Sequence, residues 1–188
     1  MTDDDVFMAA QRAMSRLGPG ELTLADIAAE AGVTAGLLVQ RFGSKRDLLL
    51  ALSERFSGGT AEMFEDLRRG RSPLAALRAY SDGMASLASS PAALARNFAY
   101  LQIDLTDPDF RKHLAKQASA TRQELVKLIR AAVEAEELLP AANPKQLART
   151  IEAIVSGSML SWAFYQEGTA AKWMRQDLDA VLKPYLVR

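Results

Sequence analysis

The 188-residue chain has no cysteine and carries 23 basic and 23 acidic residues, so its formal net charge is +0. These numbers exclude disulfides and cysteine metal sites, and they exclude a strongly basic global field as the source of any attraction to nucleic acid. No apolar run approaches the ~18 residues that a membrane span needs, and the first residues are acidic where a signal peptide would be basic. We therefore expect a cytoplasmic protein that does not bind membranes.

The first predicted helix begins at the acidic run Asp3–Asp5, because negative charge is favourable at a helix N-terminus. Apolar residues then recur with the helical period, and Gly18-Pro19-Gly20 ends the helix. Alanine and leucine dominate the composition, the aromatic fraction is 7%, and no strand-like alternation occurs. The sequence therefore predicts an all-α protein of about nine helices.

Residues 23–45 predict two short helices joined by a tight turn. Thr23 can cap the first helix, and Asp26 lies at the spacing of a capping box. Gly32 follows where the chain must reverse, because a positive φ costs glycine little. Thr34 can then cap the second helix. Two helices joined by a short turn that contains glycine form the helix-turn-helix pattern, whose second helix can enter a major groove.

The rest of the chain predicts a helical body. A helix from residue 45 to about 69 is interrupted by Gly58-Gly59, which indicates either a kink or a flexible joint. Beyond it, N-cap residues are repeatedly followed by proline, a combination that begins helices. Together with a cap at Thr169, these signals place the remaining helices at 73–89, 91–105, 108–139, 144–167 and 170–186. We expect a head of residues 1–46 and a body of residues 47–188.

One block carries a family resemblance: Thr23-Leu24-x-Asp26-Ile27-Ala28-x-x-Ala31-Gly32-Val33-Thr34, followed by Gly36, Leu38, Phe42, Ser44-Lys45 and Leu48-Leu49. The block resembles the tetracycline-repressor (TetR) family of bacterial transcription regulators. The resemblance implies a homodimer with three-helix DNA-binding heads and helical bodies, each body enclosing a ligand pocket. It implies a ligand-responsive regulator whose leading interpretation is a repressor. Such a repressor binds a palindromic operator and is released by a small, mainly apolar effector.

The resemblance also implies which residues contact DNA. They are Thr23, Thr34, Ala35, Gly36, Leu37, Gln40, Arg41 and Lys45. The implied phosphate contacts come from Thr23 and Lys45, while the others lie on or beside the groove-facing surface. Ala35 stands where the family often has a basic residue, and Val39 stands where it usually has a phosphate-binding tyrosine. Residues 1–57 hold six basic and eight acidic residues. We therefore expect modest affinity and a shallow salt dependence.

Aromatic residues and methionines of the body suggest an apolar effector site with a few polar anchors. The pocket candidates are Met84, Phe98, Gln102 and Trp162. Apolar stripes on the last two helices are compatible with intramolecular core, but we favour a dimer interface because a two-fold operator needs two heads about 34–36 Å apart. The interface candidates are Ile151, Val155, Met159, Trp173, Leu178, Val181 and Leu182.

The sequence bears on two other functional classes. A helical interaction or ligand-carrier protein, whose head does not bind DNA, is the alternative that the apolar second helix and the acidic head leave open. An enzyme is not expected, because the chain has no cysteine, one histidine, and neither a nucleophile elbow nor a phosphate-binding glycine loop. No cofactor or metal is expected.

Overall fold

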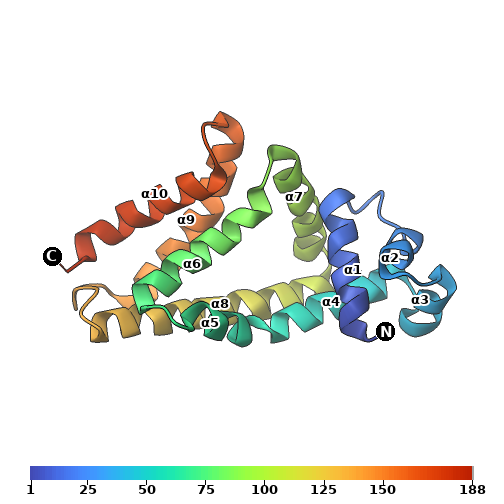
Figure 1. The fold of residues 1–188 in the computed structure, drawn as a ribbon, viewed down its shortest axis with the longest axis horizontal. Helices are drawn as coiled ribbons and strands as arrows, with labels where there is room; N and C mark the ends of the chain where they lie inside the picture. The colour runs from blue at the N-terminus through green and yellow to red at the C-terminus, as the bar shows by residue number, and fades with distance from the viewer. Residues whose placement is uncertain (188) are drawn as a thin grey trace. The chain divides into compact units, whose positions relative to one another are not determined.

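The structure is a computed structural model that describes residues 1–187, and it is built from α-helices (Figure 1). The helices are α1 (Asp3–Arg16), α2 (Leu24–Ala31), α3 (Ala35–Phe42), α4 (Lys45–Gly58), α5 (Thr60–Arg68), α6 (Pro73–Ala85), α7 (Pro91–Thr106), α8 (Pro108–Glu134), α9 (Pro144–Tyr165) and α10 (Ala170–Leu182), with 3-10 turns at Ser86–Ala88 and Lys183–Tyr185. Within residues 1–187, strand-type pairing is limited to an isolated bridge between Leu138 and Leu186. The predicted all-α class is confirmed.

The chain divides into two compact units. The N-terminal unit comprises Met1–Gly58 and Ala95–Lys116, and the C-terminal unit comprises Gly59–Leu94 and the chain from Gln117 onward. In the N-terminal unit, α4, most of α7 and the start of α8 pack with the first three helices. Helices α7 and α8 therefore each contribute to both units. The predicted division into residues 1–46 and 47–188 stays a prediction.

Short-range hydrogen bonds define where the first two helices begin. At α2, the Thr23 hydroxyl accepts the Asp26 N–H at 3.2 Å, and the Asp26 carboxylate accepts the Thr23 N–H at 2.8 Å. The predicted capping box is therefore present. The same arrangement occurs at α1 between Thr2 and Asp5, with distances of 3.2 and 2.6 Å. Each box satisfies backbone donors that a helix N-terminus leaves unpaired.

The core of the N-terminal unit joins the apolar faces of α1 to α4 with one side chain from α8. The Phe7 and Phe42 rings lie 5.9 Å apart, and the α8 residue Phe110 is buried in the same cluster. The Tyr100 hydroxyl donates to the Leu17 carbonyl at 2.9 Å, and burial raises the pKa of Tyr100 to about 12. The buried members are Val6, Phe7, Ala10, Ala13, Leu22, Ile27, Ala28, Leu38, Leu48, Leu49, Leu52 and Phe110.

The structure places the interruption of the helix at the single residue Gly59. Helix α4 ends at Gly58 and α5 begins at Thr60, with Gly59 as an N-cap whose φ is −85° and ψ is 0°. Glycine offers no side-chain oxygen to cap the following helix, and it is the least favourable helix residue apart from proline. The single predicted helix is therefore two helices, and residues 1–187 contain ten α-helices where about nine were predicted.

The C-terminal unit is a helical bundle in which α10 packs on α9 and α6 (Figure 1). Ser72 caps α6 and Asn143 caps α9, and in both helices proline follows at the first position, as predicted. The helix predicted to run from 108 to 139 ends at Glu134, and the chain leaves the helical conformation at Glu136, whose φ is +56°. In the part of the chain that the structure describes, no helix combines the length and apolarity needed to cross a bilayer.

Candidate nucleic-acid interface

The turn between α2 and α3 is only three residues long, and its geometry depends on one glycine. Gly32 has φ 70° and ψ 34°, in the left-handed region that side-chain-bearing residues disfavour. The following Val33 N–H donates to the Ala28 carbonyl at 2.9 Å, which closes the C-terminus of α2. Thr34 then begins α3 by accepting the Leu37 N–H at 3.2 Å. The helix-turn-helix predicted from the sequence is therefore present.

Helix α3 buries one side chain and exposes the opposite face. Leu38 is fully buried, whereas Thr34, Gly36, Leu37, Gln40 and Arg41 are exposed and Ala35 is half-buried. We call the surface formed by these six residues, Thr34 to Leu37 with Gln40 and Arg41, the outer face of α3. Its amide and guanidinium groups belong to Gln40 and Arg41, and its other residues are small or apolar. It can offer hydrogen bonds from Gln40 and Arg41 to base edges or phosphates, and van der Waals contact from Leu37.

Thr23 lies on the surface but is engaged within its own helix. Its hydroxyl lies 2.5 Å from the Asp26 carboxylate and also accepts the Asp26 N–H. Hydrogen bonds from the side chain and backbone of Thr23 lower the pKa of Asp26. The N-terminus of α2 therefore already holds an ionised carboxylate at neutral pH.

Lys45 has a structural role that its sequence position did not reveal. Its ammonium donates to the Leu22 carbonyl at 2.6 Å and to the Pro19 carbonyl at 3.0 Å. Both acceptors lie in the connection between α1 and α2, so the first residue of α4 holds this loop in place. Since an ammonium has three protons, one remains for a phosphate.

Arg41, the only cation of α3, is paired with the start of α1. Its Nε lies 2.6 Å from the Asp3 carboxylate, and an Nη donates to the Met1 carbonyl at 3.3 Å. The guanidinium also lies 5.8 Å from the centre of the Phe42 ring. Asp3 was predicted only as a helix-starting residue, and its role as the partner of Arg41 was not predicted.

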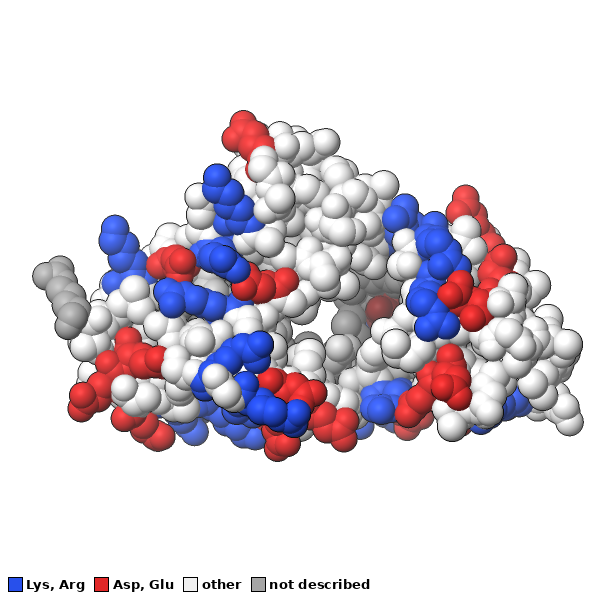
Figure 2. Space-filling view, viewed as in Figure 1, with Lys and Arg blue, Asp and Glu red and all other residues white. Residues whose placement is uncertain are grey.

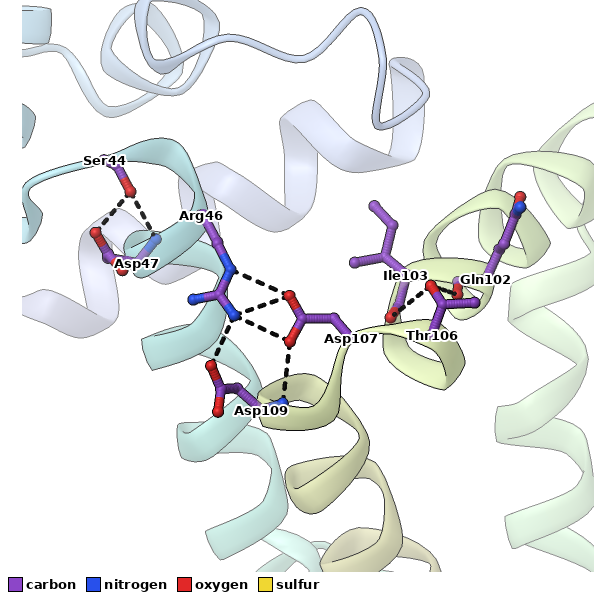
Figure 3. Close-up of polar contacts among 8 residues, drawn as sticks. All are labelled: Ser44, Arg46, Asp47, Gln102, Ile103, Thr106, Asp107 and Asp109. Atoms are coloured by element: carbon purple, nitrogen blue, oxygen red, sulfur yellow. Dashed lines mark hydrogen bonds and ion pairs between the residues drawn. The ribbon is translucent and has the colours of Figure 1, made fainter.

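Arg46 ties the first turn of α4 to the corner between α7 and α8 (Figure 3). The guanidinium donates to both oxygens of Asp107 at 2.8 to 3.1 Å and to Asp109 at 2.7 Å. The hydrogen bonds with Asp109 and Asp107 raise the pKa of Arg46, and those from Arg46 lower the pKa of Asp107. Asp107 also accepts the Asp109 N–H at 3.0 Å. We call these three residues the Arg46 latch.

The remaining cations of Met1–Gly58 also have acidic partners. Arg12 and Arg16 both bind Glu30, and Arg55 lies 3.0 Å from Asp4. All six cations of this segment are therefore engaged by groups of the N-terminal unit. On the face that Figure 2 shows, basic and acidic groups are interleaved rather than gathered in one basic patch.

The residues predicted to line an effector pocket lie in different units. Phe98 and Gln102 are exposed residues one turn apart on α7, in the N-terminal unit. Met84 is half-buried against the core of the C-terminal unit. Trp162 is buried in that core, and its indole N–H donates to the Gly168 carbonyl at 3.3 Å.

Most residues predicted for the dimer interface are covered by their own chain. Ile151, Leu178 and Leu182 have no exposed surface, and Val155 and Met159 are also buried. Trp173 and Val181 are half-buried against the same core. These residues stabilise the packing of α9 on α10 within one chain, so their apolar stripes do not by themselves provide a free surface. The large exposed apolar residues of α9 are Leu160, Phe164 and Tyr165.

Two family models match this chain. The model described as bacterial regulatory proteins of the tetR family matches residues 7–52, and the model described as a tetracyclin repressor-like C-terminal domain matches residues 74–178. The first match spans the helix-turn-helix, and the second covers more than half of the chain. No curated protein matches the sequence significantly.

Solved structures share the fold over nearly the full length. A TetR transcription regulator from Haloarcula marismortui ATCC 43049 superposes with a TM-score of 0.75 at 18% identity, covering 98% of each chain. SmeT, the repressor of the Stenotrophomonas maltophilia multidrug efflux pump SmeDEF, superposes with a TM-score of 0.68 at 23% identity. The match covers 100% of this chain and 91% of the SmeT chain. FadR from Bacillus subtilis, in complex with stearoyl-CoA, superposes with a TM-score of 0.70 at 17% identity. The match covers 96% of this chain and 98% of the FadR chain. A SmeT–triclosan complex superposes with a TM-score of 0.69 at 22% identity, and the match covers 98% of this chain and 91% of the SmeT chain.

Proposed function

Because the chain belongs to the tetR family of bacterial regulatory proteins, we propose that it is a ligand-responsive repressor that binds a palindromic DNA operator as a homodimer. The observation that carries this proposal is the exposed outer face of α3, presented by a turn whose caps and glycine conformation form a helix-turn-helix. A helix held in this way can enter the major groove of DNA.

The proposed DNA contacts are those on and beside the outer face of α3. Gln40 and Arg41 supply polar groups, and Gly36 and Ala35 allow the helix backbone to approach DNA closely. The Thr34 hydroxyl and the remaining proton of Lys45 are proposed phosphate donors. Thr23 contributes through its hydroxyl only if it exchanges its bond to Asp26.

The proposed effector is a small, mainly apolar molecule that releases the DNA. Support comes from SmeT, solved with triclosan, and from FadR, solved with stearoyl-CoA. Triclosan is largely apolar, and stearoyl-CoA carries a long apolar acyl chain on a polar coenzyme A group. On this chain we propose Phe98 and Gln102 as effector contacts, since an exposed ring and an amide lie one turn apart on α7. Such a pairing can hold an apolar molecule by contact and orient it by a hydrogen bond.

The proposed dimer surface centres on the end of α9. Phe164 is 71% exposed and Tyr165 is 67% exposed, and Tyr165 stacks on Trp173 of α10 with ring centroids 5.7 Å apart. Large exposed aromatic groups close together are typical of interaction surfaces. A two-fold axis through this surface would bring two copies of the same patch together.

The Arg46 latch provides a proposed route from effector to DNA. It connects α4, which follows the helix-turn-helix, to the corner at the end of α7, the helix of the proposed effector contacts. A ligand that favours a different position of α7 would shift α4 through these bonds. Allosteric release requires such differential binding to two conformations.

The second candidate function, a ligand carrier whose head does not bind DNA, is favoured by one observation: all six cations of Met1–Gly58 are engaged within the chain. Fluorescence anisotropy with the intergenic DNA beside the protein's own gene distinguishes the two. Sequence-selective, salt-sensitive binding supports the repressor. Equal and weak binding to that DNA and to a scrambled duplex supports the carrier.

A further inference from the structure

The pairing of Arg41 with Asp3 places a carboxylate beside the only cation on the outer face of α3. The two groups are 2.6 Å apart, and their side chains remain 34% and 55% exposed, respectively. The pair therefore lies at the surface and is open to competition from a phosphate. Other cations of Met1–Gly58 also pair with acids on other helices, such as Arg55 of α4 with Asp4 of α1.

Asp3 is not required to form α1. The capping box of that helix uses Thr2 and Asp5, and its hydrogen bonds do not include the Asp3 side chain. Asp4 and Asp5 also supply negative charge to the first turn, where each acid contributes a modest, salt-screened stabilisation. The side chain of Asp3 is therefore left to interact with Arg41.

We propose that Asp3 is an intramolecular competitor of the DNA backbone for Arg41, so that α1 limits the affinity of the outer face of α3 for DNA. This inference rests on the proposed DNA-binding function. A phosphate that approaches Arg41 must displace the Asp3 carboxylate and is repelled by it. The exchange replaces one ion pair with another, so Arg41 adds less to the affinity than an unpaired arginine would.

The size of the effect follows from the exposure of the pair. An exposed ion pair contributes about 0.2–1 kcal/mol, which corresponds to a change in the dissociation constant of up to about fivefold. Removal of Asp3 also removes a negative charge beside Arg41, whose effect on a bound phosphate is screened over about 10 Å at 0.1 M salt. We therefore expect Asp3→Asn to tighten DNA binding about two- to fivefold at that ionic strength.

The test is anisotropy with a labelled intergenic duplex and four full-length variants. Asp4→Asn is the matched control, because it removes the same charge from the same helical turn but its partner is Arg55. Arg41→Gln and the double variant Asp3→Asn/Arg41→Gln complete a double-mutant cycle. Circular dichroism melting verifies that each variant is folded.

The proposal expects tighter binding with Asp3→Asn than with Asp4→Asn, and loss of this gain when Arg41 is already glutamine. Equal gains from the two asparagine variants would overturn it, because the effect would then be general charge repulsion. A gain that exceeds that of Asp4→Asn and persists in the Arg41→Gln background, or no gain at all, would also overturn it while leaving DNA binding by the wild-type protein intact. No DNA binding by any variant, wild type included, would contradict the proposed function itself.

Discussion

Gly36 is the residue at which stability and proposed function make opposite demands. A Cβ added there would meet only the Thr34 hydroxyl, at 4.0 Å. Gly36→Ala should therefore stabilise the protein, by up to about 1 kcal/mol, because alanine favours the helix more than glycine does. It should also weaken DNA binding if the backbone of α3 approaches the duplex closely. Urea denaturation and anisotropy measure the two effects.

Gly83 of α6 offers the matched control. It also lies in a helix, with nothing within 4 Å of an added Cβ. Gly83→Ala should stabilise the protein comparably and leave DNA affinity unchanged. If Gly36→Ala stabilises the protein without weakening DNA binding, the outer face of α3 is not a close-contact surface.

Lys45 illustrates a residue whose role differs from what its position suggests. Lys45→Met keeps the aliphatic stem but loses the bonds to the Leu22 and Pro19 carbonyls. Hydrogen bonds from a charged group contribute about 1.5–3 kcal/mol, so we expect a loss of about 1–3 kcal/mol in the free energy of unfolding. Lys116→Met, on an exposed lysine of the same unit, should change it by less than about 0.5 kcal/mol. Unchanged stability in Lys45→Met, with weaker DNA binding, would show that phosphate is its main partner.

The sequence separation between two interacting residues decides whether their roles could be predicted. The Thr23–Asp26 box, Gly32 and the Thr34 cap involve neighbours within five residues, so local physics was enough to predict them. The bonds from Lys45 to the loop before α2 cross more than twenty residues, and the Arg46–Asp107 pair crosses 61. Such pairs form only after the helices have packed, and one sequence contains no signal that selects the partner. The Thr2–Asp5 box is equally local, because the same T-x-x-D spacing begins the chain, and yet it was not predicted.

At the scale of elements, the Arg46 latch determines how firmly α4 is held to the corner between α7 and α8. Arg46→Gln removes its bonds to Asp107 and Asp109. Local opening requires the loss of such contacts, so amide hydrogen exchange should become faster in the first turn of α4 and at the corner. Arg55→Gln, which removes another arginine of α4, should leave exchange at the corner unchanged. Equal exchange at the corner in both variants would exclude the latch as a connection.

The pH dependence of the latch follows from the lowered pKa of Asp107. A carboxyl whose pKa is lower in the folded state contributes stability above its unfolded pKa, about 3.9 for aspartate. That stability is lost as the pH falls through the lower folded-state value. The protection factors of the amides at the corner, which are corrected for the intrinsic pH dependence of exchange, should therefore stay constant through the neutral range and fall only in acid below about pH 4.

Elements whose boundaries depend on packing were the hardest to place. The Ser-Pro and Asn-Pro starts of α6 and α9 were correctly predicted, because the signal lies at the boundary itself. The end of α8 at Glu134 and the break between α4 and α5 were less exact. No glycine or proline marks the former position, and the effect of a glycine pair inside an apolar pattern depends on what packs beside it.

At the scale of the whole molecule, the proposed homodimer depends on the aromatic end of α9. Phe164→Asp should dissociate it. Burial of a phenylalanine side chain contributes about 1.5–3 kcal/mol, and a two-fold interface contains two copies, so the dissociation constant should rise about 10²- to 10⁴-fold. Size-exclusion chromatography with light scattering measures the mass. Met63→Asp, at an exposed position of α5, is the control.

The same region shows what an apolar sequence pattern leaves open about the predicted interface residues. A sequence pattern reports that a helical face is apolar, but it does not report which helix covers it. In the structure α10 covers that face of α9, so Ile151 and Leu178 are core residues. A monomeric wild-type protein at micromolar concentration would contradict the proposed dimer, whereas a dimer insensitive to Phe164→Asp would place the interface elsewhere.

The central claim, that the outer face of α3 binds operator DNA, is tested most directly by wild-type anisotropy at several salt concentrations. The intergenic duplex beside the protein's own gene is compared with a scrambled duplex of equal length. We predict selective binding of the intergenic duplex, two protomers per site, and a shallow slope of log K against log salt, because few head cations are free to replace counterions. Binding of both duplexes with the same affinity and slope, or no binding at low salt, would contradict the claim.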